Sequence, residues 1–205
     1  MLRSDNGCER PRGRLARLTP MLAVLAALAV GVSAAAQGGG ESSKTKGGAG
    51  PCALAHSGPS KLTQPEAALA VHCLLNKRRA NHGISPFGSN DNLGITAQRH
   101  TDHMLIRQCF AHECPGESGI TTRIQQTGYM SGAKSWGVGE NIAAGRGDRG
   151  SPAKIVAAWM DSPPHRANIL SPKFQHVGVG MVHSTPFKPQ GGGATYTTDF
   201  GYSEG

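Results

Sequence analysis

The N-terminal quarter of this chain cannot supply a packed core, and this limits the fold to the remaining residues. Five arginines precede an uncharged apolar run from Met21 to Val32, and Ala34 with Ala36 forms a small-residue cleavage pattern, which is the layout of an export signal. An uncleaved membrane anchor is the alternative, because no charge lies between residues 18 and 36. We therefore predict a signal peptide over residues 1–36, a flexible Gly/Ser-rich linker over 37–51 and one folded domain over 52–205.

The charge of the chain is only mildly basic once the signal is set aside. The net charge of +8 falls to +5 without the five arginines, Asp5 and Glu9 of the signal. The remaining Lys and Arg residues are scattered, apart from Lys77-Arg78-Arg79, and no aromatic residues are interleaved with them. We therefore expect no nucleic-acid partner, whereas a screened attraction to an anionic cell envelope is compatible with this charge.

Four cysteines remain after Cys8 leaves with the signal, and an even number in an oxidising compartment predicts two disulfides. Three connectivities are possible. We favour Cys109–Cys114, which are close in sequence, and Cys52–Cys73, because Cys73 lies away from the apolar stripe of its predicted helix, where the incoming chain can be tied down. A zinc knuckle fits poorly, because no second close cysteine pair exists.

Helix signals dominate the first part of the domain. Thr63 and Glu66 form a capping-box pattern, and the apolar stripe that follows them runs through Arg78 until Asn81-His82-Gly83. A second helix face points His100 inward. The predicted helices cover residues 63–81, 90–109, 120–127 and 151–162, and the last of these must end at Pro163-Pro164.

Alternating sequence patterns predict strands near the C-terminus. Residues 176–182 and 194–200 alternate with period two around a Gly-rich loop, so they are expected to form an antiparallel pair. Gly178 and Gly180 share one strand face and leave room for a helix to pack closely. Helices first and strands last predict an α+β fold in which helices cover a small antiparallel sheet.

Three distant segments carry side chains able to bind a metal or move a proton. They are residues 111–117, 137–145 and 159–170. A pair of imidazoles can ligate zinc or another divalent cation, and nearby carboxylates can orient them or act as a general base. No local spacing joins the three segments, so the chemistry depends on the tertiary fold.

Ordered motifs over residues 66–202 resemble a known family. They are Asn76-Lys77-Arg78-Arg79 with Gly83, the helix face of Leu93, Ala97, His100 and Met104, then His112, Gly128-Tyr129, Gly139-Glu140-Asn141-Ile142-Ala143, Trp159-Met160 with Ser162-Pro163, His165-Arg166, Asn168-Ile169-Leu170, Val177-Gly178-Val179-Gly180 and Asp199-Phe200-Gly201. This pattern resembles bacterial CAP domains, the superfamily of cysteine-rich secretory proteins, antigen 5 and pathogenesis-related 1 proteins. The resemblance implies a three-layer α/β/α sandwich with a cleft that holds two histidines and two acidic residues.

The resemblance assigns the cleft residues position by position. His112 and His165 match the two histidines and would be the metal ligands, and Glu140 matches the Glu of the Gly-Glu-Asn-Ile motif. Glu117 fits the second acid, with Glu113 as its competitor. These assignments predict a ligand-binding set of His112, Glu117, Glu140 and His165. The sequence departs from the family at Pro164, where Gly is usual, and the departure puts the backbone orientation of His165 in doubt.

Each candidate also has a purely structural interpretation. His112 and His165 can cap backbone groups, Glu140 can hold the entry to a strand, and Glu117 can be exposed. His100 is expected to be a core residue with satisfied hydrogen bonds rather than a ligand.

Three functions follow from these assignments. The first is a secreted or envelope-associated monomeric binding module for a small apolar or envelope-derived ligand, with a weakly held zinc or other divalent cation, since relatives are described as binding sterols, lipids or metals. The second is a weak metal-dependent hydrolase, which we rank lower because no Gly-x-Ser-x-Gly elbow surrounds Ser162; we therefore expect no catalytic residues. The third is an extracellular scaffold that acts through surface contacts.

Overall fold

The computed structural model describes residues 50–187 and 192–205. The predicted signal peptide and nearly all of the predicted linker therefore lie outside the described residues. Within these two ranges, no helix combines the length and the apolar character that crossing a bilayer requires.

Five α-helices and four strands, together with three short 3-10 helices, make up the described residues. The helices are α1 Gln64–Ala80, α2 Asp91–Arg107, α3 Ile120–Gln125, α4 Pro152–Asp161 and α5 Pro163–Ile169; the 3-10 helices are η1 Pro51–His56, η2 Pro59–Lys61 and η3 Gly147–Gly150; the strands are β1 Gly88–Ser89, β2 Ser135–Arg146, β3 His176–Val182 and β4 Gly193–Glu204. The predicted helices are all present, with ends shifted by one or two residues.

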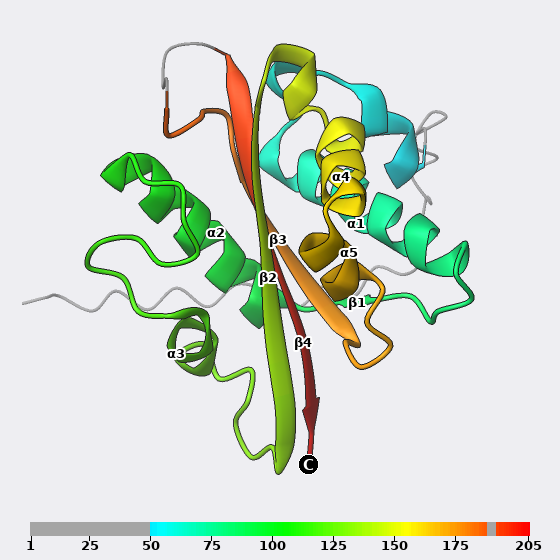
Figure 1. Ribbon diagram of the computed structural model, residues 1–205, viewed down its shortest axis with the longest axis vertical. Coiled ribbons are helices and arrows are strands. Elements are labelled where there is room, and N and C mark those ends of the chain that lie inside the picture. The colour runs from blue at the N-terminus through cyan, green and yellow to red at the C-terminus, as the bar shows by residue number, and fades with distance from the viewer. Residues whose placement is uncertain (1–49, 188–191) are drawn as a thin grey trace, which may run out of the picture. The chain divides into compact units, whose positions relative to one another are not determined.

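A four-stranded sheet in the order β1-β3-β4-β2 separates two helical layers. Helices α2 and α3 lie on one side of it, and α1, α4 and α5 lie on the other (Figure 1). The predicted antiparallel pair is β3 and β4, while β1 adds a parallel strand and β2 pairs antiparallel with β4 along its full length. The three-layer sandwich is thus confirmed, with a mixed sheet at its centre.

Local sequence signals explain where the first two helices begin. The Thr63 hydroxyl accepts a hydrogen bond from the Glu66 backbone while the Glu66 carboxylate accepts one from the Thr63 backbone, so the predicted capping box is confirmed. Helix α2 is capped by the Asn90 side chain, which accepts from the Leu93 N–H. Both N-termini are therefore set by residues close by in the chain.

A buried arginine lies at the C-terminal end of the inner face of α1. Arg79, and not Arg78 as the stripe predicted, is buried; its guanidinium lies over the Phe87 ring and donates to the backbone carbonyls of Ser85, Ile169, Ser171 and Phe174. The reason is that four carbonyl acceptors replace the water that a buried guanidinium loses. Arg79 therefore ties α1 to the end of α5 and to the loop before β3.

Two glycines of β3 bring α2 directly onto the sheet. A Cβ at Gly178 would lie 2.0 Å from the Gly94 backbone nitrogen, and one at Gly180 would lie 2.5 Å from the backbone of Ala97. No larger residue fits at either position, which confirms the predicted close helix. This contact presses the inner face of α2, including the buried His100, against β4 and β3.

Both favoured disulfides are present. Cys52 bonds to Cys73, so η1 is fastened to α1, and Cys109 bonds to Cys114 in the loop after α2. The second bridge closes a short loop that carries His112. The covalent framework therefore supports the same segment that the sequence singled out for chemistry.

Candidate functional site

The centre of the candidate site is a carboxylate held between an imidazole and a guanidinium. Glu140 lies in the middle of β2; its Oε1 is 2.7 Å from Nδ1 of His112, and its Oε2 accepts a hydrogen bond from Nη2 of Arg123. The Glu140 side chain is 3% exposed and Arg123 is 8% exposed, whereas His112 is 57% exposed. The buried pair thus fixes one face of an imidazole whose other face is open to solvent.

Arg123 also fixes the loop that carries His112. Its Nη1 donates to the backbone carbonyls of His112 at 2.9 Å and Ser118 at 3.0 Å, and it lies 3.6 Å from the carboxylate of Glu117. Arg123 therefore holds the loop on both sides of Cys114, once inside the bridged segment and once after it. No pattern in the sequence indicated this role, because a single Arg in a short helix has no distinguishing neighbours.

Glu117 pairs with a histidine on α2. Its two carboxylate oxygens lie 2.8 and 2.9 Å from Nδ1 of the buried His100, whose Nε2 is 3.7 Å from Glu140. Glu113 is exposed, so of the two competing acids only Glu117 joins the network. His100 is buried as expected, but its Nε2 has no hydrogen-bond partner among the described residues, so the expectation of a fully satisfied core histidine is wrong. The ring lies between the two acids, which the sequence analysis missed.

A third acid lies behind Glu140. Asp199 of β4 stands directly opposite Glu140 in the strand register and is fully buried. Neither of its oxygens has a hydrogen-bond partner among the described residues, and the same holds for His100 Nε2 and Arg123 Nε. The sequence signal was the single carboxylate within the predicted strand 194–200, whose other residues are uncharged.

His165 lies in the opposite helical layer and contacts the strand that carries Glu140 through its backbone. It lies on α5, and Pro163 and Pro164 form the first turn of this helix with trans peptide bonds. Pro164, which departs from the family pattern, therefore fits the start of the helix. The His165 carbonyl accepts from Asn141 Nδ2 at 3.1 Å, next to Glu140 on the strand. Because β2 is the outer strand of the sheet, side chains from both layers can meet at its open edge.

Three further hydrogen bonds fasten the helices of that layer to β2. Asn168 donates to the Glu140 carbonyl at 3.2 Å and to the Asn141 side chain at 2.9 Å, and the Trp159 indole donates to the Ile142 carbonyl at 3.1 Å. The motifs around Glu140 and His165, which are far apart in sequence, therefore form one hydrogen-bonded unit.

The pKa values of the His112 and His165 imidazoles are shifted in opposite directions. The hydrogen bond to Glu140 raises the pKa of His112 above its ordinary value, although partial burial opposes the shift. Burial lowers the pKa of His165, and the charge of His112 lowers it further. This repulsion is consistent with two imidazoles that share one region, of which His112 holds its proton more tightly.

The pKa values of the two buried acids, Glu140 and Asp199, are also shifted in opposite directions. Burial alone would raise the pKa of Glu140, but the hydrogen bond from His112 and the charges of His100 and Arg123 bring it below the ordinary value. Burial raises the pKa of Asp199 well above its usual range, and the adjacent Glu140 charge acts in the same direction. The two shifts have opposite directions, so of this strand pair Glu140 loses its proton more readily than Asp199.

The donor set does not match a three-ligand metal centre. Within residues 50–187 and 192–205, no three His, Cys, Asp or Glu side chains converge on a possible metal position. Glu140 and Glu117 are already bonded to His112, Arg123 and His100. Catalytic zinc usually takes three protein ligands, so we derive no metal-dependent step from this site.

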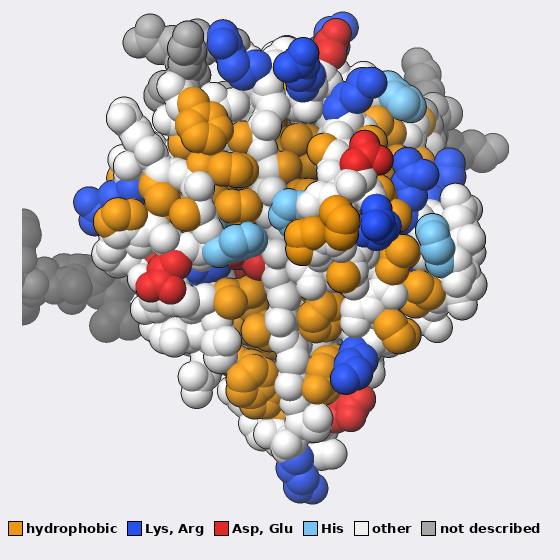
Figure 2. Space-filling view, viewed as in Figure 1, with side chains coloured by type: hydrophobic (Ala, Val, Ile, Leu, Met, Phe, Trp, Pro, Cys, Tyr) orange, Lys and Arg blue, Asp and Glu red, His pale blue; other side chains and the backbone are white. Residues whose placement is uncertain are grey.

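The surface over β2 combines imidazole, acidic and basic groups. Figure 2 shows histidine side chains at the middle of this face, over β2 and between the two helical layers, with acidic and basic atoms recessed beside one of them. Hydrophobic side chains surround this polar centre on the same face. Such a surface suits a ligand that has both polar and apolar parts.

Comparison with known proteins identifies the family. A family model described as the cysteine-rich secretory protein family, CAP, matches residues 73–189. The chain belongs to this family. The match includes the second half of α1, helices α2 to α5 and the strand that carries Glu140, so the resemblance seen in the motifs is confirmed.

Several bacterial proteins are similar to the CAP domain described here. An uncharacterized Bacillus subtilis protein, YkwD, is 32% identical over 128 residues, which are 62% of this chain and 46% of the relative. An uncharacterized membrane protein of the same species, YlbC, is 26% identical over 59% of this chain and 33% of its own length. The chain thus matches less than half of these curated relatives.

Solved structures share the fold. An extracellular Bacillus anthracis protein with an SCP domain superposes with a TM-score of 0.56 at 23% identity, covering 71% of this chain and 42% of that one. An outer surface protein of Borrelia burgdorferi gives a TM-score of 0.53 at 15% identity, covering 65% of this chain and 90% of its own. At these identities the likeness concerns the fold.

Proposed function

We propose that this CAP domain is an extracellular binding module that recognises an envelope-derived ligand with polar and apolar parts through His112 and His165. The observation that carries the proposal is the contrast in exposure along one hydrogen-bonded chain, in which a 57% exposed imidazole is backed by a 3% exposed Glu140 and a buried Arg123. Such support holds an open ring nitrogen in a fixed direction before any ligand arrives, which lowers the entropic cost of binding.

The extracellular assignment is supported by chemistry as well as by the predicted signal. Two disulfides fit an oxidising compartment. We propose that the mature domain is secreted or remains at the cell envelope, where its mild positive charge favours anionic polymers.

Hydrolysis is the weaker candidate because the imidazoles have no nucleophile beside them. Among the described residues, no Ser, Thr or Cys side chain hydrogen-bonds to His112 or His165. A general base needs the attacking group within hydrogen-bond reach. A robust hydrolytic activity that disappears in His112→Ala and His165→Ala would reverse this ranking.

A divalent cation bound only by the two imidazoles is a secondary proposal. Its ligands must be neutral, so the raised pKa of His112 makes the cation compete with a proton. Zinc affinity should therefore decrease as pH falls through about 6.5, which calorimetric titration at two pH values measures. Equal affinity at both values would exclude histidine ligation.

The primary test is ligand capture by the secreted chain from its own host, followed by unbiased mass spectrometry. We expect one enriched compound class with the wild type, and its loss with His112→Ala/His165→Ala. Glu113→Gln is the matched control, because Glu113 is an exposed neighbour outside the network. Equal recovery from the double variant would place the ligand elsewhere and refute the proposal.

A further inference from the structure

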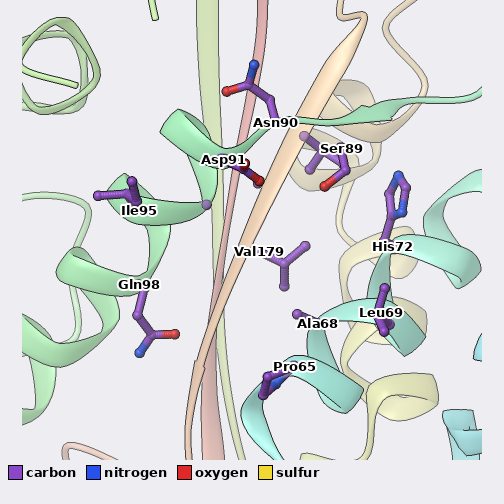
Figure 3. A pocket seen from close by; sticks show the side chains of 13 residues that line it. Pro65, Ala68, Leu69, His72, Ser89, Asn90, Asp91, Ile95, Gln98 and Val179 are labelled. Carbon is purple, nitrogen blue, oxygen red and sulfur yellow. The ribbon is translucent and has the colours of Figure 1, made fainter. Parts of the chain in front are cut away.

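A groove of about 700 Å³ runs along the outer edge of β3, away from the histidine site. Helix α1 forms one wall and α2 the other, with residues 177–179 of β3 as the floor (Figure 3). Leu69 on α1 and Ile95 on α2 lie on opposite sides of it and are 54% and 44% exposed. The volume lies within the ~300–1,000 Å³ typical of ligand sites, and large exposed aliphatic side chains on both walls indicate a partner.

The edge of β3 is covered at both ends of this groove. Strand β1 pairs with β3 only at His176 and Val177, and the Asn90 N–H donates to the Val177 carbonyl at 3.1 Å. Farther along, the Gln98 side-chain amide bonds to both backbone groups of Met181, at 2.9 and 3.2 Å. The Gln98 amide therefore takes the place of a neighbouring strand at this point.

One residue between these two covers has an open backbone donor and acceptor. Alternate residues of a strand direct their backbone groups to the same edge, so Val179 faces outward like Val177 and Met181. Among the described residues nothing bonds to the outward N–H and C=O of Val179. An unpaired donor and acceptor side by side at the floor of an apolar groove match the edge of an extended peptide.

The carboxylate that lines the groove favours peptides with a basic side chain. Asp91 is the carboxylate among its lining residues, and it is exposed and makes no ion pair with a described residue. The His72 ring nitrogen at the same end is already bonded to the Phe87 carbonyl at 3.0 Å. A basic side chain of the occupant therefore has one place to pair, beside Asp91.

We propose that this groove binds an extended peptide segment of a partner protein, which adds a short strand to β3 at Val179, places aliphatic side chains between Leu69 and Ile95, and directs a Lys or Arg toward Asp91. An acyl chain fits the groove less well, because it would cover the N–H and C=O of Val179 without forming hydrogen bonds to them. The site is independent of the proposed histidine function, since none of its lining residues belongs to that network.

The test is an NMR titration of the secreted chain with the peptide Ac-Lys-Val-Ala-Val-Ala-NH2. We expect saturable shifts of the Val179 and Met181 amides. The same peptide N-methylated at its last four residues keeps the side chains and loses the backbone donors, so it should bind at least tenfold more weakly. Replacing its Lys by norleucine should weaken binding to the wild type about two- to fivefold, as for an exposed ion pair, but should not weaken binding to Asp91→Asn.

Variants of the protein distinguish a loss of binding at the groove from a loss of folding. Leu69→Asp should abolish binding while leaving the unfolding midpoint near that of the wild type, because Leu69 is exposed. Gln98→Ala should bind the peptide more tightly, because it uncovers Met181. The proposal is overturned if no saturable shifts occur, if the N-methylated peptide binds equally, if decanoate displaces the peptide and shifts the same amides, or if the shifts follow protein concentration and so report self-association.

Discussion

The buried pair of Arg123 and Glu140 allows a sharp test of how this site is held together. Replacing Arg123 by Met removes the guanidinium, and Glu140, whose side chain is 3% exposed, keeps the His112 hydrogen bond and the more distant His100 ring at 3.7 Å. The carbonyls of His112 and Ser118 lose their donor as well. Removing one partner of a buried ion pair costs about 3–5 kcal/mol, so we expect Arg123→Met to lower the free energy of unfolding by that amount.

Urea unfolding at pH 7, followed by tryptophan fluorescence, measures the effect, since Trp159 is buried. At about 2–4 °C per kcal/mol for a domain of this size, the melting temperature should drop by roughly 6–20 °C. Arg99→Met is the matched control, because Arg99 is exposed on α2, and it should change stability by less than about 0.5 kcal/mol.

The double variant Arg123→Met/Glu140→Leu completes the cycle. It leaves no unpaired charge at this place, so it should cost less than the sum of the two single variants by about 2 kcal/mol or more. The reasoning fails if Arg123→Met costs under about 1 kcal/mol, or if the two single costs simply add. Either result would mean that Glu140 is solvated or paired in a way that the buried geometry does not show.

Three further predictions concern protons and the covalent framework. NMR titration should show that the pKa of His112 lies above its ordinary value and falls in Glu140→Gln. The stabilisation by this pair is full below about pH 6.5 and is lost as pH rises through the folded pKa of His112. A pKa of His112 that Glu140→Gln leaves unchanged would contradict this prediction. Because the pKa of Asp199 is raised, the native state retains a proton that the unfolded chain loses above about pH 4. The stability of Asp199→Asn relative to the wild type should therefore increase with pH above that value. A constant difference in melting temperature across pH 5–8 would show that Asp199 is ionised. Replacing Cys52 and Cys73 by Ala opens a loop with a sequence separation of 21 and should cost about 3 kcal/mol in chemical unfolding, whereas an unchanged midpoint would indicate that η1 adds nothing to the fold.

The helices and the C-terminal strand pair follow from local signals in the sequence. The capping box at Thr63, the Asn90 cap and the Pro163-Pro164 stop act over a few residues, so periodicity and capping chemistry suffice to locate these elements. Gly178 and Gly180 indicated a close helix because the absence of a side chain is itself visible in a sequence. Strand β2 was not predicted, because its glycines and mixed polarity hide the alternation.

The site was only partly visible in the sequence. His112, Glu140, His165 and Glu117 could be named from motifs, but the partners of these residues could not. The sequence by itself determined where the four predicted helices form and which residues carry titratable groups, because those properties depend on neighbours along the chain. Only the tertiary structure decided among the three possible cysteine pairings and brought Arg123 and Asp199 next to Glu140. The directions in which the pKa values of the two acids shift follow from this arrangement, because a pKa depends on burial and on charges that the fold brings together from distant segments.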